Sequence, residues 1–260
     1  MQTTSYPSDL TDAQWALLEP MLPKTNPLGR PPSPGRPIFD GILYVLRGGI
    51  PWRFLPTEYG PWQTVYGKFR RWKQAGVWKS LNDRLRTEVR KARGKRARPT
   101  GCILDSQTVR SADHGGAVGY DAAKKIKGRK RHLLVDTLGL LLGIWITPAS
   151  TPERAGAQGL LSQALQWFSW LRILWVDGGY TGPDFAAWVR TQRPKLAVEV
   201  VRRCDDVKGF KLLPRRWVVE RTFGWLMKQR RLVRDYEETE SSAAAMVHLA
   251  MIHIMLRRLA

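Results

Sequence analysis

Gly101-Cys-Ile-Leu-Asp-Ser-Gln-Thr108 sets the architecture of this chain. Three apolar residues run directly into Asp105, a pattern that predicts a short buried strand ending in a carboxylate. The arrangement recurs downstream, where Leu171-Arg-Ile-Leu-Trp-Val176 runs into Asp177. We therefore expect two strands that each deliver an acidic side chain at or near their ends.

A third acid, Glu220, lies in the helical segment 214–231, where Pro214 suits the first turn. Phosphodiesters resist attack, and two Mg²⁺ ions can activate the attacking oxygen and stabilise the leaving one. Because Mg²⁺ prefers hard oxygen ligands, a few carboxylates suffice to bind it. We predict a site with two Mg²⁺ ions, replaceable by Mn²⁺, in which Asp105 bridges both ions and Asp177 and Glu220 each hold one.

Each acid also has a plainer interpretation. A strand-end aspartate is often a helix cap, and Asp177-Gly178-Gly179 is typical of a turn. Glu220 follows Arg216 by four residues, as in a surface ion pair. The four histidines show no metal-binding spacing, which argues against a zinc site. Asp136, another strand acid, is the reserve candidate.

The charge of the chain indicates its partner. Its 260 residues carry 43 Lys and Arg against 22 Asp and Glu, a formal net charge of +21. The basic residues occur in separate blocks along a folded chain, which favours nucleic acid over a membrane surface. The two cysteines have no CxxC spacing, and neither a signal peptide nor an 18-residue apolar run is present. We therefore expect a cytoplasmic, nucleoid-associated protein without a membrane partner.

Helical periodicity dominates residues 1–93, with helices expected over 9–22, 38–46, 62–76 and 77–93, and an extended loop at 24–37. Helices joined by glycine-containing turns, with a basic last helix, are typical of a helix-turn-helix DNA reader. A helical bundle whose lysines face water is the alternative. Residues 61–100 contain thirteen basic and two acidic residues. The DNA-contacting residues expected here are Arg53, Lys68, Arg70, Arg71 and Lys73.

A basic linker is expected at 94–100, and the periodicity then becomes strand-like. The order over 101–240 is three strands, helix, strand, helix, strand, helix, with a hairpin at 132–147. This order predicts an α/β domain with a mixed sheet flanked by helices. The final helix, 241–260, is expected to pack on this catalytic domain or to form a dimer contact.

A basic run precedes that hairpin, with six basic residues among the eight positions 124–131. We interpret it as a loop that contacts the DNA backbone, the alternative being a solvated loop. The residues concerned are Lys124, Lys125, Lys127, Arg129, Lys130 and Arg131.

Several linked motifs resemble bacterial transposases of the insertion sequence 5 family. In the amino-terminal region these are Leu10-Thr-Asp-Ala-Gln-Trp15, Gly41-Ile-Leu-Tyr-Val-Leu-Arg47, Gly49-Ile-Pro-Trp-Arg53 and Gly60-Pro-Trp-Gln-Thr-Val-Tyr66. Further along they are Asp105-Ser-Gln-Thr108, Lys127-Gly-Arg-Lys-Arg-His132, Val135-Asp-Thr137, Asp177-Gly-Gly-Tyr180 and Arg216-Trp-Val-Val-Glu-Arg-Thr-Phe-Gly-Trp-Leu226.

The resemblance implies a ribonuclease H-like catalytic fold with a DDE triad of Asp105, Asp177 and Glu220. It also implies that Arg216 contacts a DNA strand or phosphate. The implied chemistry is cleavage at transposon ends by water, followed by attack of the freed 3′-hydroxyl on target DNA. The implied partners are double-stranded terminal repeats and target DNA, bound by a homodimer or larger assembly. A catalytically silent DNA-binding protein and a nuclease of the same fold are the rival hypotheses.

Overall fold

The computed structural model describes residues 6–23, 34–113, 116–201 and 216–260. The chain divides into two compact units. Unit 1 comprises Met1–Gly94, Leu226–Val233 and Ala245–Ala260, and unit 2 comprises Lys95–Trp225 and Arg234–Ala244. The break after Gly94 lies one residue from the end of the helical domain expected from the sequence.

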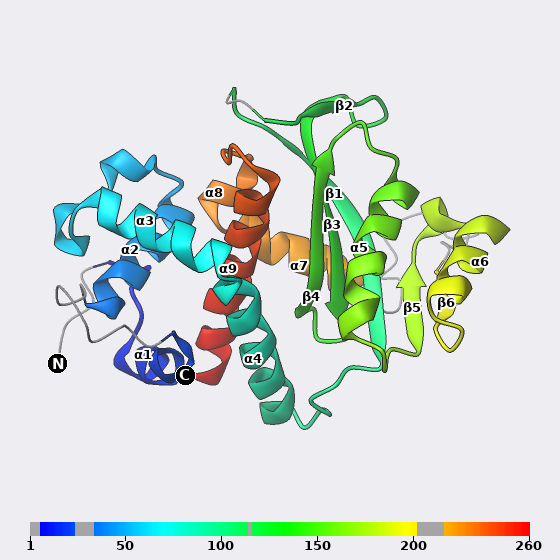
Figure 1. Ribbon diagram of the computed structural model, residues 1–260, viewed down its shortest axis with the longest axis horizontal. Helices are drawn as coiled ribbons and strands as arrows, with labels where there is room; N and C mark the ends of the chain where they lie inside the picture. The colour runs from blue at the N-terminus through cyan, green and yellow to red at the C-terminus, as the bar shows by residue number, and fades with distance from the viewer. Residues whose placement is uncertain (1–5, 24–33, 114–115, 202–215) are drawn as a thin grey trace, which may run out of the picture. The chain divides into compact units, whose positions relative to one another are not determined.

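In its described residues, unit 1 consists of helices joined by turns and loops, without a strand (Figure 1). Its amino-terminal elements are α1 (Asp12–Leu18), η1 (Glu19–Met21), α2 (Gly35–Gly48), η2 (Trp52–Phe54), η3 (Thr57–Tyr59), α3 (Trp62–Gln74) and α4 (Val77–Ala92). The later segments add α8 (Arg230–Val233) and most of α9 (Glu240–Leu259).

Local signals account for several of these boundaries. Thr11 and Gln14 form a reciprocal capping box that starts α1. Gly49 ends α2 in the left-handed conformation, which glycine adopts without a steric penalty. The loop expected over 24–37 is shorter than predicted, because α2 already begins at Gly35 and tolerates Pro37 in its first turn. Residues 24–33 of that loop lie outside the described residues.

The carboxyl-terminal helix corrects one expectation. From Ala245 onward α9 belongs to unit 1 and not to the catalytic unit, on which we expected it to pack. The alternative expectation, a dimer contact, stays a prediction. Met246, Val247, Leu249 and Ala250 are fully buried at adjacent positions around the helix. A helix that is apolar on most sides is an interior helix, so α9 forms part of the core of unit 1.

Unit 2 contains a mixed sheet (Figure 1). In the described residues its strands are β1 (Gly101–Arg110), β2 (Gly119–Asp121), β3 (Ile126–Asp136), β4 (Leu141–Pro148), β5 (Ile173–Val176) and β6 (Ala197–Val200). The order is β2-β3-β1-β5-β6, and β2 and β4 pair with successive parts of the same edge of β3. β1 pairs antiparallel with β3 and parallel with β5. This is the mixed α/β sheet predicted from the element order.

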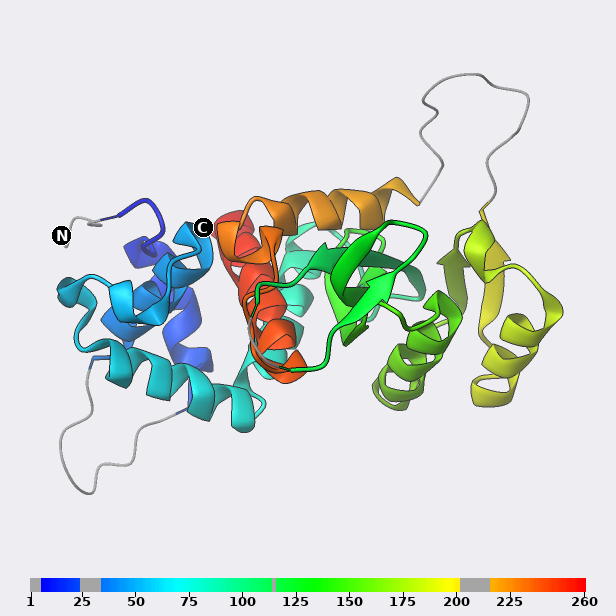
Figure 2. The ribbon, with the colours of Figure 1, turned by 90° about the horizontal axis from the view of Figure 1, so that it is seen from above.

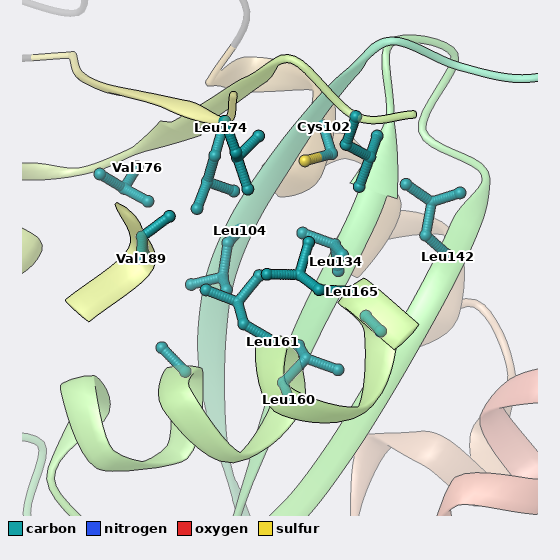
Figure 3. Packing of buried hydrophobic residues seen from close by; sticks show 14 of the residues in the cluster. Cys102, Leu104, Leu134, Leu142, Leu160, Leu161, Leu165, Leu174, Val176 and Val189 are labelled. Atoms are coloured by element: carbon teal, nitrogen blue, oxygen red, sulfur yellow. The ribbon is translucent and has the colours of Figure 1, made fainter. Parts of the chain in front are cut away.

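Helices cover both faces of this sheet. α5 (Glu153–Trp167) and α7 (Trp217–Met227) lie on opposite faces (Figure 2), and α6 (Pro183–Gln192) connects β5 to β6. Under α5, Leu104 and Leu134 from neighbouring strands pack against Leu160 and Leu161 (Figure 3). Since side chains alternate across a strand, Asp105 points to the other face, toward α7. No helix in the described parts of the chain is long and apolar enough to cross a bilayer.

The hairpin differs from its expected form in one respect. β3 begins at Ile126, six residues before the expected start, and pairs there with β2, a short strand that the sequence did not reveal. The basic run 124–131 is therefore mostly strand and not loop. The physical reason is that β3 has strand partners on both edges, which pair its backbone groups, while Asp235 and Asp121 pair two of its basic side chains.

Position 156 of α5 requires glycine, because the helix backbone lies very close to a side chain of β3 there. A Cβ atom at Gly156 would lie 2.1 Å from Cε1 and Nε2 of His132, whose ring is fully buried and bonded to Thr147. We expect Gly156→Ala to lower the free energy of unfolding by about 2–3 kcal/mol, measured by urea denaturation, because the methyl group overpacks this contact.

Gly224→Ala is the matched control, since a Cβ atom at that helical glycine meets nothing within 4 Å. It should be neutral or stabilise the protein by up to about 1 kcal/mol through helix propensity. Equal effects of the two substitutions would show that the His132 contact is not constraining.

Candidate active site

Asp105 lies in β1, just beyond the point where the neighbouring strand β5 ends. β5 stops at Val176, whereas β1 continues to Arg110. The Asp105 side chain is 18% exposed, and its Oδ1 atom accepts a hydrogen bond from the Ser106 backbone N–H at 2.7 Å. The carboxylate is thus held within the sheet yet open to solvent on one side.

Asp177 is brought beside Asp105 by strand register. β1 and β5 run parallel with Ile103 paired to Trp175, so the two acids stand at equivalent positions two residues further along. Asp177 also caps the turn η4 (Gly178–Tyr180) by accepting a hydrogen bond from the Gly179 N–H at 2.9 Å. Asp177 therefore has the turn role that its sequence context indicated, while its other oxygen, Oδ2, faces Arg216.

Glu220 completes the group from the first turn of α7. The Arg216 Nη2 atom, just before that helix, lies 4.0 Å from Asp105 Oδ2 and 3.7 Å from Asp177 Oδ2. The same atom lies 3.5 Å from Glu220 Oε1. The three acids expected from the sequence thus surround a single guanidinium. Pro214, proposed as the start of this helix, lies outside the described residues.

The pKa of Asp105 is shifted by burial and by the charges around it. Burial raises the pKa of Asp105 to about 6, and the negative charges of Asp177 and Glu153 act in the same direction. The Ser106 N–H and Arg216 oppose the shift. Several carboxylates gathered here without a positive charge would destabilise the fold, so the site requires a cationic partner.

The donor set suits a hard divalent cation. The three carboxylates supply oxygen ligands only, and Mg²⁺ or Mn²⁺ prefers such ligands. Within the described ranges, no three acidic, histidine or cysteine side chains already stand at metal-binding distance from one another. Arg216 Nη2 instead provides the positive charge among the acids, so a cation would bind by replacing this guanidinium.

The remaining candidates lie elsewhere. Asp136 is fully buried and accepts hydrogen bonds from the Leu138 and Leu140 N–H groups, so it stabilises the turn between β3 and β4. It pairs with Cys102, three residues along β1 from Asp105. Burial, followed by the Lys130 charge, lowers the pKa of His132 to about 4, so this ring is neutral at physiological pH. Neither residue belongs to the acidic group.

One further acid reaches the site, and sequence reasoning missed it. Glu153, in the first turn of α5, accepts a hydrogen bond from the Ser106 hydroxyl at 2.9 Å. Lys124 Nζ lies 3.3 Å from the same Glu153 oxygen. In the sequence Glu153 looks like an ordinary helix-start acid after Pro152, a position that favours acids in any helix. Only the folding of α5 onto β1 reveals the contact.

Three residues of the basic run are not available to DNA, which corrects the prediction. Arg129, Lys130 and Arg131 are at most 5% exposed. Arg129 forms a buried ion pair with Asp235 at 3.2 Å and donates to the Glu237 and Glu238 carbonyls. Lys130 donates to the Thr151 carbonyl. These side chains hold the sheet to its neighbouring segments.

The other predicted DNA-contacting residues keep accessible side chains. Lys124, Lys125 and Lys127 are exposed around the β2–β3 turn of unit 2. In unit 1, Arg53, Arg70 and Arg71 are exposed and Lys68 and Lys73 are half-buried. Arg53 lies 5.5 Å from the Trp62 ring and Lys68 5.1 Å from the Trp72 ring, contacts that orient the cations along α3.

In unit 2, acids from β1, from the end of β5 and from the first turn of α7 meet at a mixed sheet with helices on both faces. The family model for the transposase DDE domain matches residues 96–255. This chain belongs to that DDE transposase family, and its fold is consistent with the ribonuclease H-like fold.

A second family model matches the amino-terminal part, and two curated relatives match part of the chain. A family model for transposases of the IS4/5 family matches residues 10–82. An uncharacterised 16.2 kDa protein of insertion element IS402 from Burkholderia cepacia is 34% identical over 117 residues, covering 42% of this chain and 78% of the relative. Uncharacterised protein y4sN from Sinorhizobium fredii is 28% identical over 120 residues, covering 46% and 86% respectively. Together these matches support an insertion sequence transposase.

The buried position of Arg129 predicts a stability effect. Arg129→Met should lower the free energy of unfolding by about 3–5 kcal/mol, because it leaves Asp235 buried without its positive partner. Thermal and urea unfolding measure this change, and DNA affinity of the folded fraction should be unaltered. Arg190→Met, at an exposed arginine of α6, is the control and should stay within about 0.5 kcal/mol. A stable Arg129→Met protein with weakened DNA binding would restore Arg129 to the DNA surface.

Proposed function

We propose that this transposase cleaves the ends of its insertion sequence and joins the freed 3′-hydroxyl to target DNA at the site of Asp105, Asp177 and Glu220. The observation that supports this function best is the convergence of three carboxylates from β1, β5 and α7 on one cationic group. Asp105 and Glu220 are held by β1 and α7. The Glu220 side chain is 52% exposed, which leaves room for a DNA strand to approach.

The proposed chemistry follows from these side chains. Divalent metal ions held by Asp105, Asp177 and Glu220 would activate the attacking oxygen and stabilise the leaving oxygen at phosphorus. Asp105, whose Oδ1 atom accepts from the Ser106 N–H, would be one of the ligands. Arg216, once displaced from the acids, carries a planar set of donors that suits a DNA phosphate. Cleavage and joining are both in-line displacements, so one set of residues can serve both.

Loss of any one acid should abolish strand cleavage. We expect Asp105→Asn, Asp177→Asn and Glu220→Gln each to reduce metal-dependent cleavage of labelled terminal-repeat DNA by at least about 10³-fold, since each removes a negative ligand. DNA affinity, measured by gel shift, should change little. Asp184→Asn, an exposed first-turn acid of α6, is the matched control and should cleave normally.

The outcomes separate the rival functions. Full cleavage by one acid variant would remove that residue from the site. Tight DNA binding without cleavage by the wild type in Mg²⁺ or Mn²⁺ would favour a silent DNA-binding protein. Cleaved products that never join to target DNA would favour a nuclease.

The proposed partner is double-stranded DNA, as terminal inverted repeats and as target, bound at the nucleoid by a homodimer or larger assembly. In unit 1 the exposed Arg70 and Arg71 lie on α3 and the exposed Arg53 lies in η2. Aromatic rings orient Arg53 and Arg70. Such a surface can contact several phosphates along one groove. We therefore place terminal-repeat recognition on α3.

Removal of two α3 charges should weaken end binding. Arg70→Ala with Arg71→Ala should raise Kd at least about tenfold and reduce the slope of log Kd against log salt by about 2, because each lost phosphate contact removes roughly one released counterion. Fluorescence anisotropy over a salt series measures both quantities.

The matched control removes the same charge from α4. Lys79 and Lys91 are already paired with Asp83 and Glu88 on their own helix. Lys79→Ala with Lys91→Ala should leave the salt slope within experimental error of the wild type. A slope unchanged by the α3 pair would move the DNA surface away from α3.

A further inference from the structure

Glu153 lies at the proposed active site but has no role in the proposed group of three acids. Its Oε1 atom accepts from the Ser106 hydroxyl at 2.9 Å and lies 3.3 Å from Lys124 Nζ. Ser106 directly follows Asp105, and its N–H donates to the Asp105 carboxylate. One carboxylate therefore connects a neighbour of the central acid with a cation from the β2–β3 turn.

The backbone of Lys124 is fixed, so this contact is part of the fold. The Lys124 N–H donates to Asp121 Oδ1 at 3.1 Å. The other Asp121 oxygen accepts from the Thr108 hydroxyl at 2.6 Å, and Thr108 lies in β1 three residues beyond Asp105. The turn that carries Lys124 is thereby fastened to the same strand that carries the central acid.

The start of α5 also contacts the loop of the second acid. Arg154 donates to the Gly179 and Thr181 carbonyls, within the turn that follows Asp177. A Cβ atom at Gly179 would lie 3.0 Å from Asp177 Oδ1 and 3.4 Å from Glu153 Oε2. Glu153 thus has one oxygen on the Ser106 and Lys124 side and the other on the Asp177 side.

A buried hydroxyl faces the same acids. Tyr180 is 1% exposed, and its hydroxyl lies near Ser106 and the acids of the site. Burial raises the pKa of Tyr180, as do the negative charges of Asp105, Glu153 and Asp177. Because Glu153 lies near Ser106, the Asp177 turn and the Tyr180 hydroxyl, it belongs to the polar site and not merely to a helix end.

We propose that Glu153 is a positioning residue of the active site, which holds Lys124 at the edge of the acidic group, on the side of Ser106, to receive a phosphate of the bound DNA strand. The proposal rests on the proposed function of the acidic triad. An ammonium group has three donors, so Lys124 can keep its contact with Glu153 and still donate to a phosphate. The Lys124 side chain is 42% exposed, which leaves it accessible to DNA.

This role predicts a separation of binding from rate. The negative charge of Glu153 opposes DNA, so its removal should leave ground-state affinity unchanged or slightly tighter. The orientation of Lys124 is lost at the same time, and misplacement of a phosphate contact slows the chemical step. A residue that only stabilises the start of α5 would change neither affinity nor rate in the folded protein.

The test is a double-mutant cycle of Glu153→Gln and Lys124→Ala in the full chain. The amide oxygen of glutamine still accepts from Ser106, so the substitution removes mainly the charge that holds Lys124. Saturating labelled terminal-repeat duplex with Mg²⁺ gives the cleavage rate, anisotropy gives Kd, and thermal unfolding gives Tm. We expect each single variant to cleave at least about tenfold more slowly, and the double variant no more than about threefold slower than Lys124→Ala.

Two controls match the substitutions in residue type and exposure. Asp184→Asn removes a first-turn acid of α6, and Lys195→Ala removes an exposed lysine of the same unit. Both should retain the wild-type cleavage rate. Glu153→Gln should retain the wild-type Tm within about 2 °C and Kd within about threefold.

Each other outcome overturns the proposal. Wild-type cleavage by Glu153→Gln would remove Glu153 from the site and leave the proposed function standing. Independent, multiplying effects of the two substitutions would show that Glu153 does not act through Lys124. A slow rate that accompanies a large fall in Tm would assign Glu153 a structural role. Absence of cleavage by the wild type itself would overturn the proposed function and this inference with it.

Discussion

Mutual repulsion among gathered carboxylates is the constraint on which the catalytic unit depends. Parallel pairing of β1 and β5 places Asp105 and Asp177 side by side, and α7 adds Glu220. Such a group is tolerated only if positive charge enters it, and Arg216 supplies that charge. Burial, together with the negative charges of Asp177 and Glu153, raises the pKa of Asp105 to about 6. A site that requires a cation for electrostatic reasons is already suited to a metal ion and a phosphate.

Basic residues serve two distinct purposes in this chain. On α3 and around the β2–β3 turn they remain accessible and suit a polyanion. On β3 they are interior, where Arg129 meets Asp235 and Lys130 meets Asp121 and a carbonyl oxygen. A buried charge is tolerated when it is paired and fully hydrogen-bonded, so these residues specify how segments far apart in sequence join the sheet. Net charge alone cannot distinguish the two uses.

The residues proposed for catalysis and those proposed for end binding lie in different units. Acids for phosphoryl transfer belong to unit 2, whereas the cations of α3 belong to unit 1. Neither unit is continuous in sequence, because residues 226–233 and most of α9 return to unit 1 after the catalytic strands are complete. The amino-terminal helices therefore obtain part of their core from the carboxyl terminus, as the fully buried Met251 and Ile252 illustrate.

Local pattern was enough to identify the strands at Asp105 and Asp177, the helices of unit 1 and the mixed sheet, because periodicity and capping act over a few residues. The same patterns put Asp105, Asp177 and Glu220 forward as one group. They could not separate buried Arg129 from exposed Lys127, since burial depends on partners on both edges of β3. They also could not reveal Glu153 or the assignment of α9 to unit 1. Those features arise from contacts between residues dozens of positions apart, which only the packed tertiary structure brings together.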